Sequence, residues 1–177
     1  FLLLNFSREV KYFSGMKDLF SPFQMEQYFV KKELLKIINP CYLESINKFN
    51  DKSIGIHIRM GDFQHIENEE ILRSGEWNCR LPIKWYVSLI ERIREKTNLP
   101  IYIFSDGYDQ ELNDVLTFNN CTRVYFGSAI SDLIALSRCK ILISSASTFS
   151  MWVSFLGQMP TIWFPGQMRQ ELINDID

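Results

Sequence analysis

The pattern of apolar and polar positions changes near residue 53. Before it lies a mixed aromatic and basic stretch, with one amphipathic helix predicted over 25–38 and a polar linker over 48–52. After it, short apolar runs alternate with segments whose apolar residues recur at helical spacing. We predict strands at 54–60, 101–104, 123–126, 141–143 and 161–164, and helices at 85–97, 111–118, 131–137 and 148–156.

Strands that alternate with helices predict an α/β fold with a doubly wound, Rossmann-like parallel sheet. We divide the chain into an N-terminal helical segment, residues 1–50, and an α/β domain, residues 51–177. Ser131 is the predicted N-cap of its helix, and Gly157 is predicted to end the helix that begins at Thr148. The nineteen residues from 63 to 81 show no clear periodicity, which indicates a functional or mobile loop.

The net charge of −2, with acidic and basic residues interspersed, argues against nucleic acid as a partner. The four cysteines lack metal-binding spacing, so we interpret them as free thiols in a reducing compartment. The opening Phe1-Leu2-Leu3-Leu4 is too short to span a membrane, although peripheral membrane association stays open. The chain also lacks an initiator Met, which leaves open that it continues upstream.

The first predicted strand carries the most informative polar residues. Its even-numbered positions from Ile54 to Met60 are apolar, whereas Gly55, His57 and Arg59 occupy the other face. Ligands of open α/β sheets bind at the carboxyl ends of the strands, where Arg59 lies. A phosphate would satisfy Arg59 through two charge-assisted hydrogen bonds. A structural ion pair between Arg59 and Asp62 explains this arginine equally well.

Two further polar segments follow strands at the same predicted sheet edge. Ser144-Ser145-Ala146-Ser147-Thr148-Phe149 begins a helix, where amides, hydroxyls and the helix dipole offer an anion site. Taken by itself, this segment is better explained by Ser147 acting as a plain N-cap. Ser105-Asp106 follows another strand and is either a ribose or base contact or a turn. The convergence of the three segments favours binding of a diphosphate.

Together these residues resemble the α-1,2-fucosyltransferases of glycosyltransferase family 11 and, more distantly, the α-1,6- and protein-O-fucosyltransferases. The resemblance covers about residues 53–165. It rests on His57-Ile58-Arg59-Met60-Gly61-Asp62, on Phe104-Ser105-Asp106, and on Asp132-Leu133 to Cys139 running into Ser145-Ala146-Ser147-Thr148-Phe149-Ser150-Met151-Trp152. It implies the C-terminal half of a GT-B enzyme that binds GDP-fucose.

The resemblance also implies roles for particular residues. Arg59 would bind the β-phosphate, His57 would shape the nucleotide pocket, and Asp62 would brace the loop. The diphosphate would be cradled by Ser147, Thr148 and Phe149, next to Ser145. The family inverts the anomeric carbon without a metal, so no metal or other cofactor is expected. Its motif has a second arginine where this chain has Met60.

The remaining expectations concern the acceptor side of the reaction. Glu67, five residues after Asp62, matches a carboxylate of the α-1,6 relatives and is our candidate general base, with His65, Glu69 and Glu70 as competitors. Trp77 is a candidate for stacking on acceptor sugar, whereas Trp85 fits a helix core.

We therefore predict a glycosyltransferase with a nucleotide-sugar donor and a glycan acceptor. It would be cytoplasmic in a bacterium, acting in surface-polysaccharide synthesis, or lumenal in the Golgi of a eukaryote. The alternatives are a non-catalytic nucleotide-sugar or glycan-binding module, and a transferase that uses another nucleotide sugar.

Overall fold

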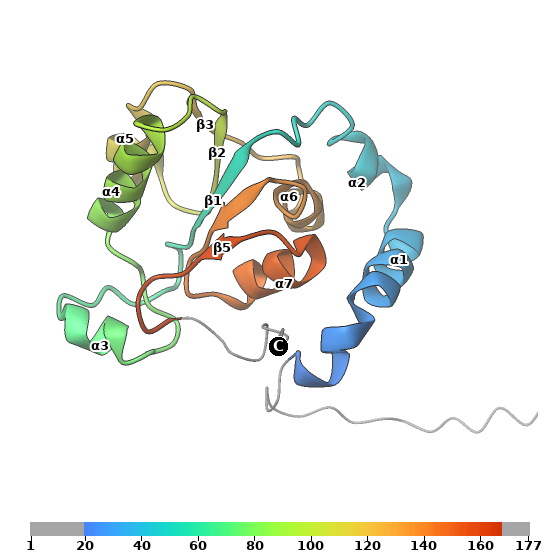
Figure 1. Cartoon of the computed structure of the whole chain (residues 1–177), viewed down its shortest axis with the longest axis horizontal. Helices are drawn as coiled ribbons and strands as arrows, with labels where there is room; N and C mark the ends of the chain where they lie inside the picture. The colour runs from blue at the N-terminus through green and yellow to red at the C-terminus, as the bar shows by residue number, and fades with distance from the viewer. Residues whose placement is uncertain (1–19, 168–177) are drawn as a thin grey trace, which may run out of the picture.

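The computed structural model describes residues 20–167, which form a five-stranded parallel sheet covered by helices on both faces (Figure 1). The strands lie in the order β3-β2-β1-β4-β5, so β1 is central. This order reverses direction beside β1, as in doubly wound folds. The strands are β1 (Ile54–Ile58), β2 (Ile101–Ser105), β3 (Cys121–Arg123), β4 (Ile141–Ile143) and β5 (Thr161–Ile162).

The helices form two layers around this sheet. On one face α4 (Ile83–Arg94) and α5 (Asp109–Leu116) cover the even-numbered positions of β1. On the other face lie α6 (Ala129–Leu136) and α7 (Thr148–Gly157), and Gly55 of β1 approaches α6 so closely that a Cβ would overlap Leu136. The predicted doubly wound α/β fold is therefore confirmed.

The N-terminal segment adds an outer layer to the α6–α7 side. A 3₁₀ turn (Ser21–Glu26) leads into α1 (Gln27–Ile37), which lies along α7, and α2 (Pro40–Glu44) lies against α6 (Figure 1). Gln27 and Lys31 both donate hydrogen bonds to the Leu156 carbonyl at the end of α7. The segment thus packs directly on the α/β body, and the division at residue 50 stays an interpretation.

Several predicted boundaries were wrong for identifiable reasons. The N-cap of α6 is Ser128, whose hydroxyl accepts from the Ser131 amide at 3.1 Å, while the Ser131 hydroxyl donates to Tyr42. Gly157 is the last residue of α7, and Gln158 adopts the left-handed conformation that ends it. The strand predicted over 123–126 is β3, displaced toward the N-terminus. The 63–81 region contains a short helix, α3 (Glu69–Arg73).

Candidate functional site

The carboxyl end of β1 presents two polar side chains on the face opposite the α4–α5 core. Alternate strand residues point to opposite faces, so His57 and Arg59 lie together with Gly55, while the intervening Ile58 is buried against α4 and α5. This confirms the two-faced strand predicted from the sequence. It also places the polar face of β1 beside the start of α7.

His57 is the centre of a buried hydrogen-bond network. Its Nδ1 lies 2.7 Å from the hydroxyl oxygens of both Ser145 and Ser150, and its ring lies 4.7 Å from that of Phe149. Burial is the main reason why the pKa of His57 is lowered to about 4, so the imidazole is neutral at pH 7. Ser145 is 2% exposed, so its hydroxyl orients His57 inside the protein. No separate role for Ser150 was predicted from the sequence.

The start of α7 combines an N-cap with backbone amides that the helix itself does not pair. The Ser147 hydroxyl accepts from the Ser150 amide at 3.2 Å, which confirms the predicted N-cap. The amides of Thr148 and Phe149 belong to the first turn, whose N–H groups an α-helix leaves without internal partners. Ser147, Thr148 and Phe149 all line the same cavity as Arg59, so the cap does not stand in the way of the predicted anion contact.

Arg59 is held by two carboxylates and an aromatic ring. One guanidinium nitrogen donates to Asp106 and another donates to Asp62 at 2.6 Å, while the guanidinium carbon lies 5.1 Å from the centre of the Phe63 ring. The Arg59–Asp62 ion pair considered from the sequence is therefore present. Asp106 also accepts from the Met60 amide at 2.7 Å, so it fixes the backbone after β1 as well as the Arg59 side chain.

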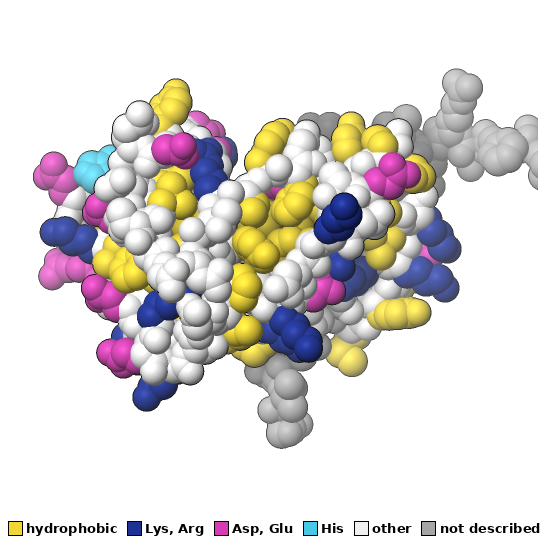
Figure 2. Space-filling view, turned by 90° about the horizontal axis from the view of Figure 1, so that it is seen from above, with side chains coloured by type: hydrophobic (Ala, Val, Ile, Leu, Met, Phe, Trp, Pro, Cys, Tyr) yellow, Lys and Arg dark blue, Asp and Glu magenta, His cyan; other side chains and the backbone are white. Residues whose placement is uncertain are grey.

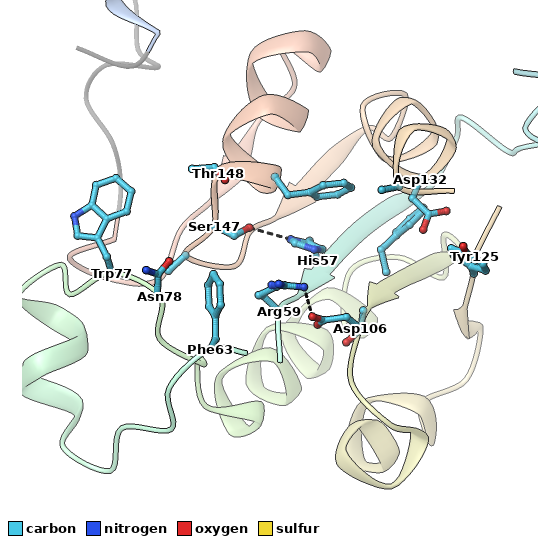
Figure 3. A pocket seen from close by; sticks show the side chains of 15 residues that line it. His57, Arg59, Phe63, Trp77, Asn78, Asp106, Tyr125, Asp132, Ser147 and Thr148 are labelled. Atoms are coloured by element: carbon cyan, nitrogen blue, oxygen red, sulfur yellow. Dashed lines mark hydrogen bonds and ion pairs between the residues drawn. The ribbon is translucent and has the colours of Figure 1, made fainter. Parts of the chain in front are cut away.

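These elements enclose a pocket of about 520 Å³ (Figure 3). Seven of the residues that line it were predicted from the sequence: His57, Arg59, Ser105, Asp106, Ser147, Thr148 and Phe149. The Ser105 hydroxyl also accepts a hydrogen bond from the Gly107 amide, so the predicted turn is present as well. Ser145 lies just behind the pocket. The other lining residues are Phe63, Trp77, Asn78, Phe104, Tyr125, Ala129, Asp132 and Ala146, of which only Trp77 had been assigned a ligand contact.

Asp132 is the pocket residue whose role the sequence did not indicate. It lies in the first turn of α6, and its Oδ1 accepts from the Phe126 amide at 2.8 Å. Partial burial raises the pKa of this carboxyl above its ordinary value. In the sequence Asp132 is only part of the segment that resembles the family, and the fold shows that it lines the pocket.

Glu67 lies in a different cavity from Arg59. A second cavity of about 490 Å³ is lined by Glu67, His65 and Met60 on the α4–α5 side of β1. Met60 is 5% exposed and belongs to the core there. The structure therefore does not bring Glu67 together with the other predicted site residues. It also shows that a side chain at position 60 points away from the pocket that contains Arg59.

Arg80 lines the second cavity and holds the loop after β1 in place. Its guanidinium donates to the carbonyl of Phe63 at 2.9 Å, to the carbonyl of Gly61 at 2.8 Å and to Glu111 at 3.1 Å. Because the hydrogen bonds to the Gly61 and Phe63 carbonyls come from one side chain, they hold this part of the loop in a single conformation. Arg80 thereby positions Phe63, whose ring contacts Arg59.

The described part of the chain contains neither a metal-binding cluster nor a membrane-spanning helix. Among residues 20–167, no group of three His, Cys, Asp or Glu side chains is placed to hold a metal ion. Within the same range, no helix is both long enough and apolar enough to cross a bilayer. Acidic and basic side chains are interspersed on the face shown in Figure 2.

Comparison with known proteins relates the chain to glycosyltransferases. It is 25% identical over 191 residues to the O-antigen biosynthesis glycosyltransferase WbnK of Escherichia coli, covering 99% of this chain and 59% of WbnK. It is 23% identical over 119 residues to galactoside alpha-(1,2)-fucosyltransferase 2 of Mus musculus, covering 62% of this chain and 32% of that protein. The chain thus spans well under two thirds of either relative.

A structural comparison matches a crystal structure of POFUT1 in complex with GDP. The TM-score is 0.48 at 13% sequence identity, and the match covers 80% of this chain and 49% of that one. The sequence model described as "Glycosyl transferase family 11" matches residues 4–166. That match spans nearly the whole chain and agrees with the resemblance carried by the residues around Arg59 and Ser147. The chain belongs to glycosyl transferase family 11.

Proposed function

We propose that this chain binds GDP-β-L-fucose and takes part in transferring the fucose to a galactoside hydroxyl, with inversion and without a metal ion. One observation carries the proposal: Arg59 and the first turn of α7 face the same pocket from neighbouring strands. A cation and unpaired helix amides together suit a diphosphate. The name of the mouse relative supports a fucosyl donor and a galactoside acceptor.

The leaving group of this reaction is GDP, whose β-phosphate gains negative charge as the glycosidic bond breaks. Arg59 and the amides of Thr148 and Phe149 would stabilise that charge, and preorganised donors at such a position commonly supply the largest part of a rate enhancement. His57, neutral and fixed by Ser145 and Ser150, would present a defined wall of the pocket to the nucleotide.

Asp132 supports guanine as the base of the nucleotide. Guanine carries two adjacent donors, N1–H and the 2-amino group, whereas adenine has neither at these positions. A carboxylate that uses one oxygen for Phe126 retains acceptor capacity for such donors. We therefore infer that Asp132 contributes to discrimination between GDP and ADP.

The general base belongs on the acceptor side of the sugar. In an inverting displacement the incoming hydroxyl and the leaving diphosphate stand on opposite sides of the anomeric carbon. A base outside the pocket of Arg59 therefore agrees with this geometry, and we retain Glu67 as the proposed base. The name of the bacterial relative supports a setting in surface-glycan synthesis, for which we propose a cytoplasmic location.

The donor site is tested by thermal unfolding with nucleotides. GDP at about 100 times its Kd stabilises a folded protein by about 2.7 kcal/mol, which for this size raises the Tm by roughly 5–10 °C. We expect GDP to raise the Tm more than UDP, ADP or NAD, and Arg59→Ala to abolish the rise. Arg92→Ala, an exposed position on α4 outside the pocket, is the matched control and should keep it.

Equal stabilisation by all four nucleotides, or none by GDP, would refute the donor site. Transfer itself is measured with radiolabelled GDP-fucose and a panel of β-galactosides, using the full-length protein. Binding of GDP with neither transfer nor donor hydrolysis would identify a non-catalytic binding module instead.

A further inference from the structure

The pocket has two chemically different ends. Asp132 and Tyr125 lie on one side of Arg59 and Ser147, and Trp77 and Asn78 lie on the other (Figure 3). A nucleotide sugar is a linear ligand in which the diphosphate separates the nucleoside from the monosaccharide. If the diphosphate binds at Arg59 and the base at Asp132, the sugar ring reaches the side of Trp77 and Asn78.

We propose that the Trp77–Asn78 turn, together with Phe63, is the subsite for the sugar ring of the donor. This inference rests on the proposed function, because it takes the position of the diphosphate from it. It assigns a ligand to the part of the 63–81 region for which the sequence predicted no structure. It also assigns Trp77 to the donor, whereas the sequence suggested a contact with the acceptor.

The turn is fixed in place by bonds on both sides of Asn78. Asn78 adopts a left-handed conformation with a φ of 56°, which asparagine tolerates better than most residues. Its carbonyl accepts from the Gln64 amide at 2.8 Å, and the Arg80 amide returns a bond to the Gln64 carbonyl at 2.9 Å. Cys79 is 1% exposed, and its thiol donates to the Trp77 carbonyl.

Because Cys79 takes the buried position, the side chains on its N-terminal side stay at the surface. Trp77 is 38% exposed and Asn78 is exposed, and both line the pocket. A locally strained backbone that its surroundings hold firmly is common at ligand-binding sites. The turn therefore presents an indole and an amide to the pocket with little freedom to be lost on binding.

The chemistry of this end suits an uncharged, partly apolar ring. An indole and the Phe63 ring offer apolar faces to the C–H groups of a pyranose, and a carboxamide both donates to and accepts from hydroxyls. Phe63, Trp77, Asn78 and Ala146 carry no charge. Among residues 20–167, Arg59 is the only arginine or lysine that lines this pocket. A neutral deoxy sugar would therefore suit this end better than a third phosphate or an acidic sugar.

The test compares the Kd of GDP with the Kd of GDP-fucose by calorimetry on the full-length protein. Trp77→Ala removes the indole, and Asn78→Gly removes the amide while keeping the left-handed conformation available. We expect the Kd for GDP of each variant to stay within about twofold of the wild-type value, and the Kd for GDP-fucose to rise about tenfold. The energy that the sugar adds to binding would then be lost, while nucleotide binding stays.

Two matched controls exist within the chain. Trp152 has nearly the same exposure as Trp77 but lies on α7 against Phe20, and Asn120 has nearly the same φ as Asn78 but lies outside the pocket. Trp152→Ala and Asn120→Gly should leave both dissociation constants unchanged.

If the two turn variants weaken the binding of GDP and of GDP-fucose equally, the sugar subsite is refuted. The turn would then contact the nucleotide or stabilise the fold instead. Unchanged Kd for GDP-fucose together with a raised KM for the galactoside would also overturn it and would assign the turn to the acceptor. Failure of the wild type to bind GDP refutes the proposed function, a result that none of the variants can imitate.

Discussion

The buried histidine of the site makes the stability of the protein depend on pH in a calculable way. His57 is 7% exposed, and burial lowers its pKa from 6.5 to about 4. Between these values the unfolded chain binds a proton that the folded protein excludes, so stability is full above pH 6.5 and is lost as the pH falls toward 4. From pH 7 to pH 5 this linkage costs about 2 kcal/mol.

His57→Asn removes the titrating group and keeps a polar atom near Ser145 and Ser150. The variant starts from a lower stability because it leaves a void beneath Phe149, but that offset is the same at every pH. The measurement is therefore the change in the free energy of unfolding between pH 7 and pH 5, obtained from urea titrations. The wild type should lose about 2 kcal/mol more than the variant. Equal losses would show that His57 takes up a proton as readily in the folded protein as in the unfolded chain, and would refute the lowered pKa.

Three other variants address the loop after β1. If Glu67 is the base, Glu67→Gln should lower kcat about 100-fold or more. The Kd of GDP should stay unchanged, because Glu67 lines a separate cavity. An unchanged kcat would show that Glu67 is not the base. Arg80→Gln should raise the KM for the donor more than it lowers kcat, because it removes the hydrogen bond to the Phe63 carbonyl. Kinetics equal to those of the wild type would contradict the role of Arg80 in positioning Phe63. Asp62→Asn should tighten GDP binding by up to about fivefold, because an exposed ion pair worth about 0.2–1 kcal/mol no longer competes for Arg59. Weaker GDP binding by this variant would instead support the bracing role implied by the family.

The order of strands and helices could be predicted because the parallel strands are short apolar runs. Ile101–Ser105 and Ile141–Ile143 are covered by helices on both sides, so almost every position is apolar and the run is visible in the sequence. The helix boundaries depended on more distant contacts. Ser128 and Ser131 are both good N-caps, and the choice between them involves the Tyr42 carbonyl, which lies 89 residues away along the chain.

The site could be predicted only where topology alone brings residues together. His57 lies near the end of β1, and Arg59, Asp106 and Ser147 follow parallel strands, whose carboxyl ends meet at one edge of the sheet. Asn78 reaches the same pocket through a turn that depends on its pairing with Gln64, for which the sequence has no periodic signal. No local pattern distinguishes such a turn from a solvated loop.

The two faces of β1 give a physical reason to expect that Met60 leaves the proposed donor site intact. Along that face, Gly55 is in contact with α6, His57 is buried among hydroxyls, and the Arg59 side chain is 32% exposed at the mouth of the pocket. Position 60 falls on the other face, where its side chain packs against α4 and α5 and borders the cavity of Glu67. An arginine there would therefore act on the second cavity and the acceptor side. Its absence leaves Arg59, the cation proposed to bind the diphosphate, in its own pocket, because the two side chains lie on opposite faces.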